Sequence, residues 1–225
     1  MSDPLISLIP TVPTRIVVAT ANPDKAREIR AVLEAEGLAI ELVPRPSGVP
    51  EVEETGETLL DNARLKARAL ADATGLAAVA DDTGLEVDPL GGAPGVHSAR
   101  YAGADATYSD NVTKVLDELD SARRNARTAR FRTVVVLAGP AGDEISAEGV
   151  IEGVIASSAR GAAGFGYDPV FVPAGGGGRT FAEMSASEKD AISHRGRALR
   201  SLARQMRDAM EPGPDPPDDT RHEEH

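Results

Sequence analysis

The sequence contains no cysteine and no tryptophan. Without cysteine there is no disulfide framework, no thiolate nucleophile and no zinc–thiolate site, so we expect a protein of a reducing compartment, the cytoplasm. Aromatic residues are also scarce, with four phenylalanines and three tyrosines among 225 residues. An aromatic residue inside a polar motif is therefore a candidate for a specific contact.

Positive charge is the next shortage. The chain has 24 lysines and arginines against 36 aspartates and glutamates, which gives a formal net charge of −12. Nucleic-acid binding needs a basic surface, so we expect no nucleic-acid partner. The sequence also lacks an apolar run of about 18 residues, the length that spans a bilayer, so we expect no membrane partner.

The hydrophobic content of 41% is enough for a sizeable core. We expect one domain over residues 15–210, preceded by an N-terminal extension at 1–14 that lacks the charged start of a signal peptide. Residues 211–225 are rich in proline and aspartate and have little to bury, so we expect a disordered acidic tail.

Strands and helices alternate in the first half of the sequence, and a long hairpin is predicted in the second half. This order predicts an α/β fold with a mixed central sheet flanked by helices. The expected strands are Arg15–Thr20, Ala39–Val43, Ala77–Ala80, a short piece at Leu85–Val87, Ala129–Leu137, Glu144–Ile155 and Val170–Val172. The expected helices run from Asn22 to Glu36, Thr58 to Thr74, Ser109 to Leu119 and Ser187 to Met210.

The segment Thr20–Lys25 follows the first strand and opens the first helix. Asn22 is a good N-cap, and Pro23 suits the first helical position. Helix N-termini attract phosphate, so the backbone N–H groups here and the charge of Lys25 predict a phosphate site. An ordinary capped helix is the alternative, because the loop lacks the Walker A pattern.

Two adjacent carboxylates, Asp81 and Asp82, are expected where the third strand ends, followed by Thr83. Adjacent carboxylates repel unless a cation, a proton or solvent relieves them. Mg²⁺ commonly binds carboxylates together with substrate phosphates, so the pair is a candidate metal site. A solvated acidic turn is the alternative.

An acidic cluster precedes the second helix and contains Glu51, Glu53, Glu54 and Glu57. Glu54 and Glu57 suit the positive end of that helix, and we interpret them as helix-stabilising residues. Glu51 lies furthest from the helix and is the better candidate for a metal ligand.

Two later motifs are GFGYDP, residues 164–169, and SEKDAISHR, residues 187–195. Glycines on both sides of Phe165 allow a ligand to approach the backbone, and the ring offers a stacking face for a base. Lys189, His194 and Arg195 are expected at the start of the last helix, where basic side chains oppose the helix dipole and suggest an anionic partner. A core phenylalanine and a solvated basic face are the alternatives.

Together, in this order, these motifs resemble the inosine triphosphate pyrophosphatase family of non-canonical purine nucleoside triphosphate pyrophosphatases. The resemblance covers most of the chain, from about Arg15 to Leu202. It implies hydrolysis of ITP, dITP and XTP to the monophosphate and pyrophosphate with Mg²⁺. It also implies a homodimer and an elongated fold with a deep cleft between two lobes.

The resemblance also implies roles for individual residues. Asp82 would be the proton acceptor and a metal ligand, Glu51 the second metal ligand and Asp81 a further candidate ligand, while Thr83 would contact the substrate. The triphosphate would be held by Thr20, Ala21, Asn22, Pro23, Asp24, Lys25 and Lys66. The base or its phosphates would be held by Phe165, Gly166, Tyr167, Asp168, Lys189, His194 and Arg195.

One departure from the family pattern is Ala21, where the family usually has glycine. Alanine costs about 1 kcal/mol or more if the loop needs a positive φ, so the departure bears on the phosphate grip. For base selection, Arg195 could donate to the 6-keto oxygen and Asp168 could accept from N1–H of hypoxanthine. Adenine would present like groups to both partners and be rejected.

Two other functions are compatible with these motifs. One is a pyrophosphatase for modified pyrimidine or ordinary nucleotides on a related fold, without 6-keto preference. The other is a nucleotide-binding protein without turnover, against which the acidic residues argue because a pure binder needs no activated water.

Overall fold

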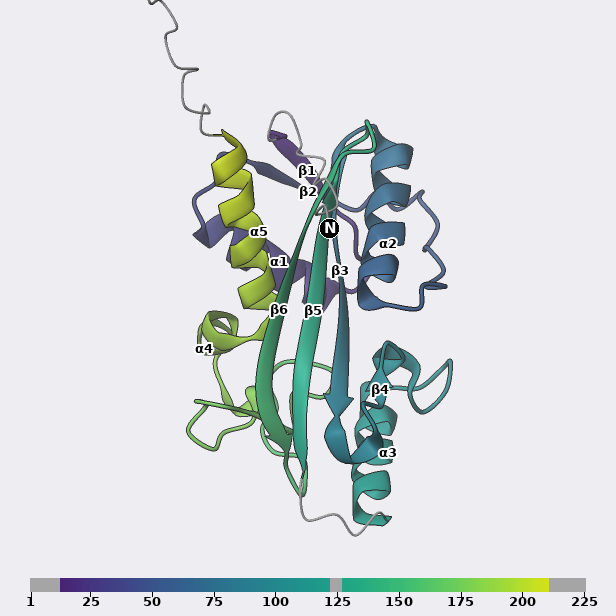
Figure 1. Ribbon diagram of the computed structural model, residues 1–225, viewed down its shortest axis with the longest axis vertical. Helices are drawn as coiled ribbons and strands as arrows, with labels where there is room; N and C mark the ends of the chain where they lie inside the picture. Colours follow the sequence, from purple (N-terminus) through teal and green to yellow (C-terminus); the bar gives the residue numbers. More distant parts are fainter. Residues whose placement is uncertain (1–12, 122–126, 211–225) are drawn as a thin grey trace, which may run out of the picture.

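The computed structural model describes residues 13–121 and 127–210. Their strands form a mixed seven-stranded sheet in the order β2-β1-β3-β5-β6-β7, with β4 paired to β3 (Figure 1). The strands are β1 (Arg15–Val18), β2 (Glu41–Pro44), β3 (Ala77–Val87), β4 (Pro94–Gly95), β5 (Thr128–Ala138), β6 (Glu144–Ile155) and β7 (Phe171–Pro173). β1, β2 and β3 are parallel, and every other pairing is antiparallel.

Helices cover both faces of this sheet. In Figure 1, α2 stands on one side of the long strands, α1 and α5 stand on the other, and α3 lies toward the opposite end of β3. The helices are α1 (Pro23–Ala35), α2 (Leu59–Thr74), α3 (Tyr108–Ser121), α4 (Ala186–Ile192) and α5 (His194–Met210), with short 3₁₀ turns at Asp88–Leu90, Ser98–Arg100 and Phe181–Glu183. The predicted α/β class with a mixed, helix-flanked sheet is therefore confirmed.

Each face of β3 packs against a different set of helices. Ala77 and Val79 pack into a cluster with α1 and α5, whereas Ala78 and Ala80 pack into a cluster with α2. Successive side chains of a strand point to opposite faces, so this alternation continues into the polar residues that follow Ala80. A third cluster around Phe171 fills the other end of the sheet.

The third strand is longer than the sequence predicted. β3 continues without interruption through the aspartate pair, which is opposite Val134 and Val135 of β5. The expectation that the aspartates end the strand is wrong, because pairing with β5 carries β3 eight residues past Val79 to Val87. Pairing of β3 with parallel β1 stops at Val79, so the aspartates lie just beyond the parallel part of the sheet.

The last predicted helix is in fact two helices. Ser193 has extended backbone angles, φ −66° and ψ 159°, and separates α4 from α5. Its backbone N–H donates to the carbonyl of Lys189, and its hydroxyl accepts from the N–H of Gly196. Ser193 thus ends one helix and caps the next. Lys189 belongs to α4, whereas His194 and Arg195 begin α5.

The start of α5 lies very close to β6. A Cβ atom added to Gly149 would collide with the carbonyl oxygen of His194 and the N–H of Ala198. Glycine at this position of β6 therefore lets the helix backbone approach the strand, which fixes the depth at which the first turn of α5 sits.

The two terminal segments predicted as an extension and an acidic tail, 1–14 and 211–225, lie outside the described residues except for Pro13 and Thr14. Among the residues that the structure describes, no helix combines the length and apolar character needed to cross a membrane.

Candidate active site

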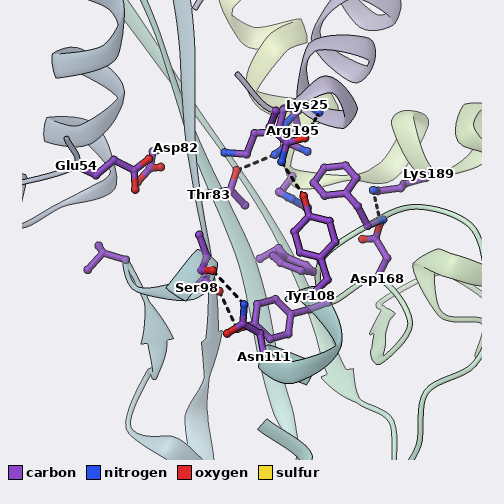
Figure 2. A pocket seen from close by; sticks show the side chains of 18 residues that line it. Lys25, Glu54, Asp82, Thr83, Ser98, Tyr108, Asn111, Asp168, Lys189 and Arg195 are labelled. Carbon is purple, nitrogen blue, oxygen red and sulfur yellow. Dashed lines mark hydrogen bonds and ion pairs between the residues drawn. The ribbon is translucent and has the colours of Figure 1, made fainter. Parts of the chain in front are cut away.

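Two adjoining pockets open beside the end of the parallel strands and share a wall. Four residues line both pockets, namely Asn22, Lys25, Glu54 and Ala99. The first pocket, shown in Figure 2, has aromatic and polar walls that include Asp82, Thr83, Tyr108, Phe165, Gly166, Tyr167, Asp168, Lys189, His194 and Arg195. The second is more polar and is lined by Thr20, Ala21, Arg45, Glu51, Lys66 and Arg100, among others.

The loop before α1 is held by its own side chains. The carboxamide oxygen of Asn22 accepts from the backbone N–H groups of Asp24 and Lys25, at 2.9 and 3.3 Å. The N–H of Asn22 itself donates to the hydroxyl of Thr20. The predicted N-cap is confirmed, and these three N–H groups donate to side chains of the loop itself, while the phosphate site at this helix start stays a prediction. Lys25 directs a side-chain ammonium to both pockets.

The two adjacent aspartates do not form a joint site. Asp81 faces α1 and α5, where Lys25 and Arg195 bind it. Asp82 faces α2, where Lys66 and Asn62 bind it. The expectation of a single carboxylate pair is wrong, since consecutive residues of a strand point to opposite faces. The repulsion is relieved by separate cations on each face.

Asp82 lines the first pocket, next to Lys66 of the second. The Lys66 ammonium is 2.8 Å from a carboxylate oxygen of Asp82 and 2.8 Å from one of Glu54. Burial raises the pKa of Asp82, and the charges of Lys66 and Lys25 only partly oppose this. A carboxylate with a raised pKa, reachable from a pocket, is suited to accept a proton.

Asp81 is buried beneath the pockets and is an anchor. One of its oxygens accepts from two nitrogens of Arg195, at 3.0 and 3.2 Å, and from the hydroxyl of Thr83 at 3.1 Å. Burial alone would raise the pKa of Asp81, but Lys25 and Arg195 hold it well below its ordinary value. Its second oxygen is buried without a hydrogen-bond partner.

A chain of buried charges connects this anchor to the GFGYDP loop. Glu28 of α1 accepts from the Arg195 guanidinium and from Lys189 at 2.7 Å. Lys189 also donates to Asp168 at 2.5 Å. Burial raises the pKa of Asp168 although Lys189 opposes the shift. The network brings the helix pair α4–α5 and the loop into one fixed arrangement with α1.

Aromatic rings form one side of the first pocket. The rings of Phe165 and Tyr108 are 6.1 Å apart, and the Lys189 ammonium is 4.6 Å from the Phe165 ring centre. The Tyr108 hydroxyl accepts from the side chain of Asn22 at 2.8 Å, so α3 touches the loop before α1. His194 is buried and stacks on Phe131 at 4.4 Å, and burial, with Arg195 and Lys189 nearby, holds its pKa well below the ordinary value.

The structure gathers most of the predicted site residues in these pockets, with a few exceptions. Pro23 and Asp24 line neither pocket, and Asp24 pairs with Arg27 at 2.9 Å. Asp81 lies behind the pocket walls. The role predicted for Glu54 at the helix start is also not observed, since Thr58 caps α2 and Glu54 binds Lys66 and Arg100.

Several lining residues were missed by sequence reasoning. They are Arg45, Ser98, Arg100, Tyr108 and Asn111, and Glu28 was missed among the supporting residues. The only available signal was the scarcity of aromatics, which should have drawn attention to Tyr108. In the sequence, Glu28 looks like an ordinary charged residue of a helix. Only its partners, more than a hundred residues away, show its role.

The carboxylates beside the two pockets bear on the predicted metal site. Within 13–121 and 127–210, no group of three or more histidine, cysteine, aspartate or glutamate residues is arranged to hold a metal. Mg²⁺ needs only one or two carboxylates when substrate phosphates complete its shell. Asp82 and Glu54 share one cation, the Lys66 ammonium, and Glu51 lines the adjoining pocket, so the oxygen donors fit such a partial site.

Comparison with known proteins decides the family. The profile of the Ham1 family matches residues 16–205. This chain belongs to the Ham1 family. It is 49% identical over 201 residues to a dITP/XTP pyrophosphatase of Frankia alni, covering 87% of this chain and 98% of that protein.

Two solved structures of the Ham1 type are similar in fold. A HAM1 protein from Coxiella burnetii is 43% identical, with a TM-score of 0.78 over 86% of this chain and 98% of its own. A nucleoside-triphosphatase, or dITP/XTP pyrophosphatase, from Mycobacterium abscessus is 47% identical, with a TM-score of 0.66 over 84% of this chain and 97% of its own.

Proposed function

We propose that this Ham1-family chain hydrolyses non-canonical purine nucleoside triphosphates, namely ITP, dITP and XTP, to the nucleoside monophosphate and pyrophosphate. The observation that carries the proposal is that Asp82 lines the aromatic pocket and binds Lys66, which lines the adjoining cationic pocket. A triphosphate whose base enters the first pocket presents its phosphates to the second. The curated relatives named dITP/XTP pyrophosphatase support the same reaction.

The reaction is an attack of water on the α-phosphorus. A new bond forms between the water oxygen and the α-phosphorus, and the bond from that phosphorus to the oxygen bridging to the β-phosphate breaks. Asp82 accepts the proton of the water, and its raised pKa favours this role at neutral pH. Lys25 and Lys66 stabilise the charge on the phosphates.

Asp82 with Glu54 or Glu51 is proposed to hold Mg²⁺. When bound, the ion screens the negative charge of the triphosphate. Asn62 is a buried neighbour of Asp82, with its amide nitrogen 3.4 Å from a carboxylate oxygen, and helps to hold that carboxylate in place.

Base selection is proposed to depend on Asp168 and Arg195. One oxygen of Asp168 is taken by Lys189 and by the N–H of Phe165, which leaves the other free to accept from N1–H of hypoxanthine. Arg195 has five N–H groups and donates four hydrogen bonds to Asp81, Glu28 and Thr83. One N–H group therefore remains for the 6-keto oxygen. Stacking on Phe165 would hold the base between Asp168 and Arg195.

The proposal includes a homodimer that acts in the cytoplasm and binds no nucleic acid. The lack of cysteine and the net charge of −12 support the last two points. Light scattering coupled to size exclusion tests the dimer directly, since a monomer mass would remove it from the proposal.

The experiment for the reaction is pyrophosphate release from ITP, XTP, dITP, ATP, GTP, CTP and UTP, with Mg²⁺ and with EDTA. We expect metal-dependent release from ITP, dITP and XTP, with adenine and pyrimidine nucleotides strongly disfavoured. Equal release from all seven would favour the broad pyrophosphatase instead. Binding of ITP without release would favour a nucleotide-binding protein.

A further inference from the structure

Four basic side chains line the polar pocket, but they are not equivalent. Lys25 is paired with Asp81 at 3.3 Å, Lys66 with Asp82 at 2.8 Å, and Arg100 with Glu54 at 3.2 Å. Arg45 makes no hydrogen bond, ion pair or ring contact with any residue in the described parts of the chain. It is half-buried, so an unpaired guanidinium faces a pocket whose other cations are already engaged.

The topology explains how Arg45 reaches this pocket. β2 runs parallel to β1 with Pro44 opposite Val18, so both strands end at the same edge of the sheet. Arg45 follows β2 directly, as the segment from Ala19 to Lys25 follows β1. Ligands of parallel sheets bind beyond the carboxyl ends of strands, and Arg45 is placed there by the same rule that places Lys25.

The backbone on both sides of Arg45 is restricted. Pro44 and Pro46 flank it, which fixes φ at both neighbours and holds Arg45 itself in extended conformations. A basic side chain on a stiff support loses less conformational freedom when it binds an anion. The flanking prolines therefore favour a binding role over that of a freely solvated surface arginine.

We propose that Arg45 binds the β- and γ-phosphates of the substrate, the part that leaves as pyrophosphate. This inference rests on the proposed function. With the base in the aromatic pocket and the α-phosphate beside Asp82, the remaining two phosphates lie in the polar pocket. A planar guanidinium binds such oxygens with two parallel hydrogen bonds, which a lysine cannot reproduce.

Two consequences follow for the reaction. Arg45 distinguishes triphosphates from monophosphates, since the monophosphate product leaves the polar pocket empty of phosphate. It also stabilises the charge that accumulates on the leaving pyrophosphate as the bond to the α-phosphorus breaks. The second effect predicts a loss in kcat as well as an increase in KM when the guanidinium is removed.

The test compares Arg45→Gln, Arg45→Lys and the control Arg204→Gln. Arg204 is an exposed arginine of α5 that lines neither of the two pockets and has the same charge to lose. Binding of inorganic pyrophosphate with Mg²⁺ and of IMP is measured by calorimetry, next to kcat and KM for ITP. Thermal unfolding of each variant checks that the fold is retained.

We expect Arg45→Gln to weaken pyrophosphate binding about tenfold to a hundredfold, as for loss of charge-assisted hydrogen bonds, with IMP binding unchanged. Arg45→Lys should lie between, and Arg204→Gln should match the unaltered chain. Pyrophosphate binding by Arg45→Gln equal to that of Arg204→Gln would overturn the inference. If the unaltered chain binds pyrophosphate through Arg45 but does not hydrolyse ITP, the proposed function fails and the site stands.

Discussion

Asp81 and Asp82 are consecutive residues of β3, and their carboxylates project from opposite faces of the sheet and bind different cations. Asp81 is buried with Arg195 and Lys25, whereas Asp82 meets Lys66 at the pocket wall. Two identical side chains therefore perform different tasks, one in holding the fold around the site and one in the chemistry.

The first prediction is that Asp81→Asn acts mainly by lowering the free energy of unfolding. Arg195 is 2% exposed, and the substitution removes one of its two carboxylate partners. Breaking a buried ion pair on one side costs about 3 kcal/mol or more, because a buried charge is left without its partner. Urea unfolding of Asp81→Asn against the unaltered chain measures the loss.

The second prediction concerns its neighbour. Asp82→Asn should lower kcat for ITP by a factor of about 100 to 10,000, the usual contribution of a general base, with little change in nucleotide binding. Its free energy of unfolding should change less than that of Asp81→Asn, because Lys66 keeps Glu54 as a partner. Full turnover by Asp82→Asn would contradict the assigned base.

The third prediction is a dependence of stability on pH that comes from His194. The pKa of His194 is held well below its ordinary 6.5 by burial, so the folded state keeps it neutral while the unfolded chain gains a proton below pH 6.5. The unfolded state then binds more protons, and stability falls as pH falls. For one such group the loss between pH 6.5 and 5 is up to about 2 kcal/mol.

Urea unfolding of the protein at pH 7, 6 and 5 measures this slope. His194→Gln is the matching variant, and its stability should depend less on pH over the same range, whatever its absolute stability. His97→Gln, at an exposed position, is the control for the loss of a histidine. Equal slopes in all three proteins would show that His194 is not the titrating group.

The fourth prediction tests the close approach of α5 to β6. Gly149→Ala places a methyl group against the backbone of His194 and Ala198, so α5 must shift. Overpacking of this kind costs about 1–3 kcal/mol or more, and the shift should also weaken ITP binding because it moves Arg195. Gly48→Ala is the control, because a methyl group there has no neighbour within 4 Å. Comparable stability of the two variants would contradict the prediction.

The sequence predicted the main elements because their signals are local. The apolar strand predicted at Arg15–Thr20, the cap at Asn22 and the long hairpin all depend on neighbouring residues. Each is observed, and the strand covers Arg15–Val18. The continuity of β3 through its two aspartates depends on pairing with β5, and the break at Ser193 accompanies the contacts of Lys189 and Arg195 with Glu28 of α1. Neither contact is encoded in the local periodicity.

The candidate site divides in the same way. Lys25, Asp82, Phe165 and Asp168 belong to recognisable motifs, and the structure places all four at the pockets. Arg45, Arg100 and Tyr108 come from segments that read as ordinary loops and a helix start. Their place at the site follows only from the tertiary arrangement, which brings α3 and the end of β2 to the loop before α1.

Because side chains alternate between the two faces of β3, the length of this strand tolerates little change in evolution. Inserting or deleting one residue between Ala78 and Asp81 would move every later side chain of β3 to the other face, so Asp81 and Asp82 would exchange their surroundings in a single step. The length of the turn at residues 139–142 does not set which face a side chain occupies in this way, so this turn can lengthen. Evolution of this fold is therefore expected to adjust loops while keeping the count of residues in β3 fixed.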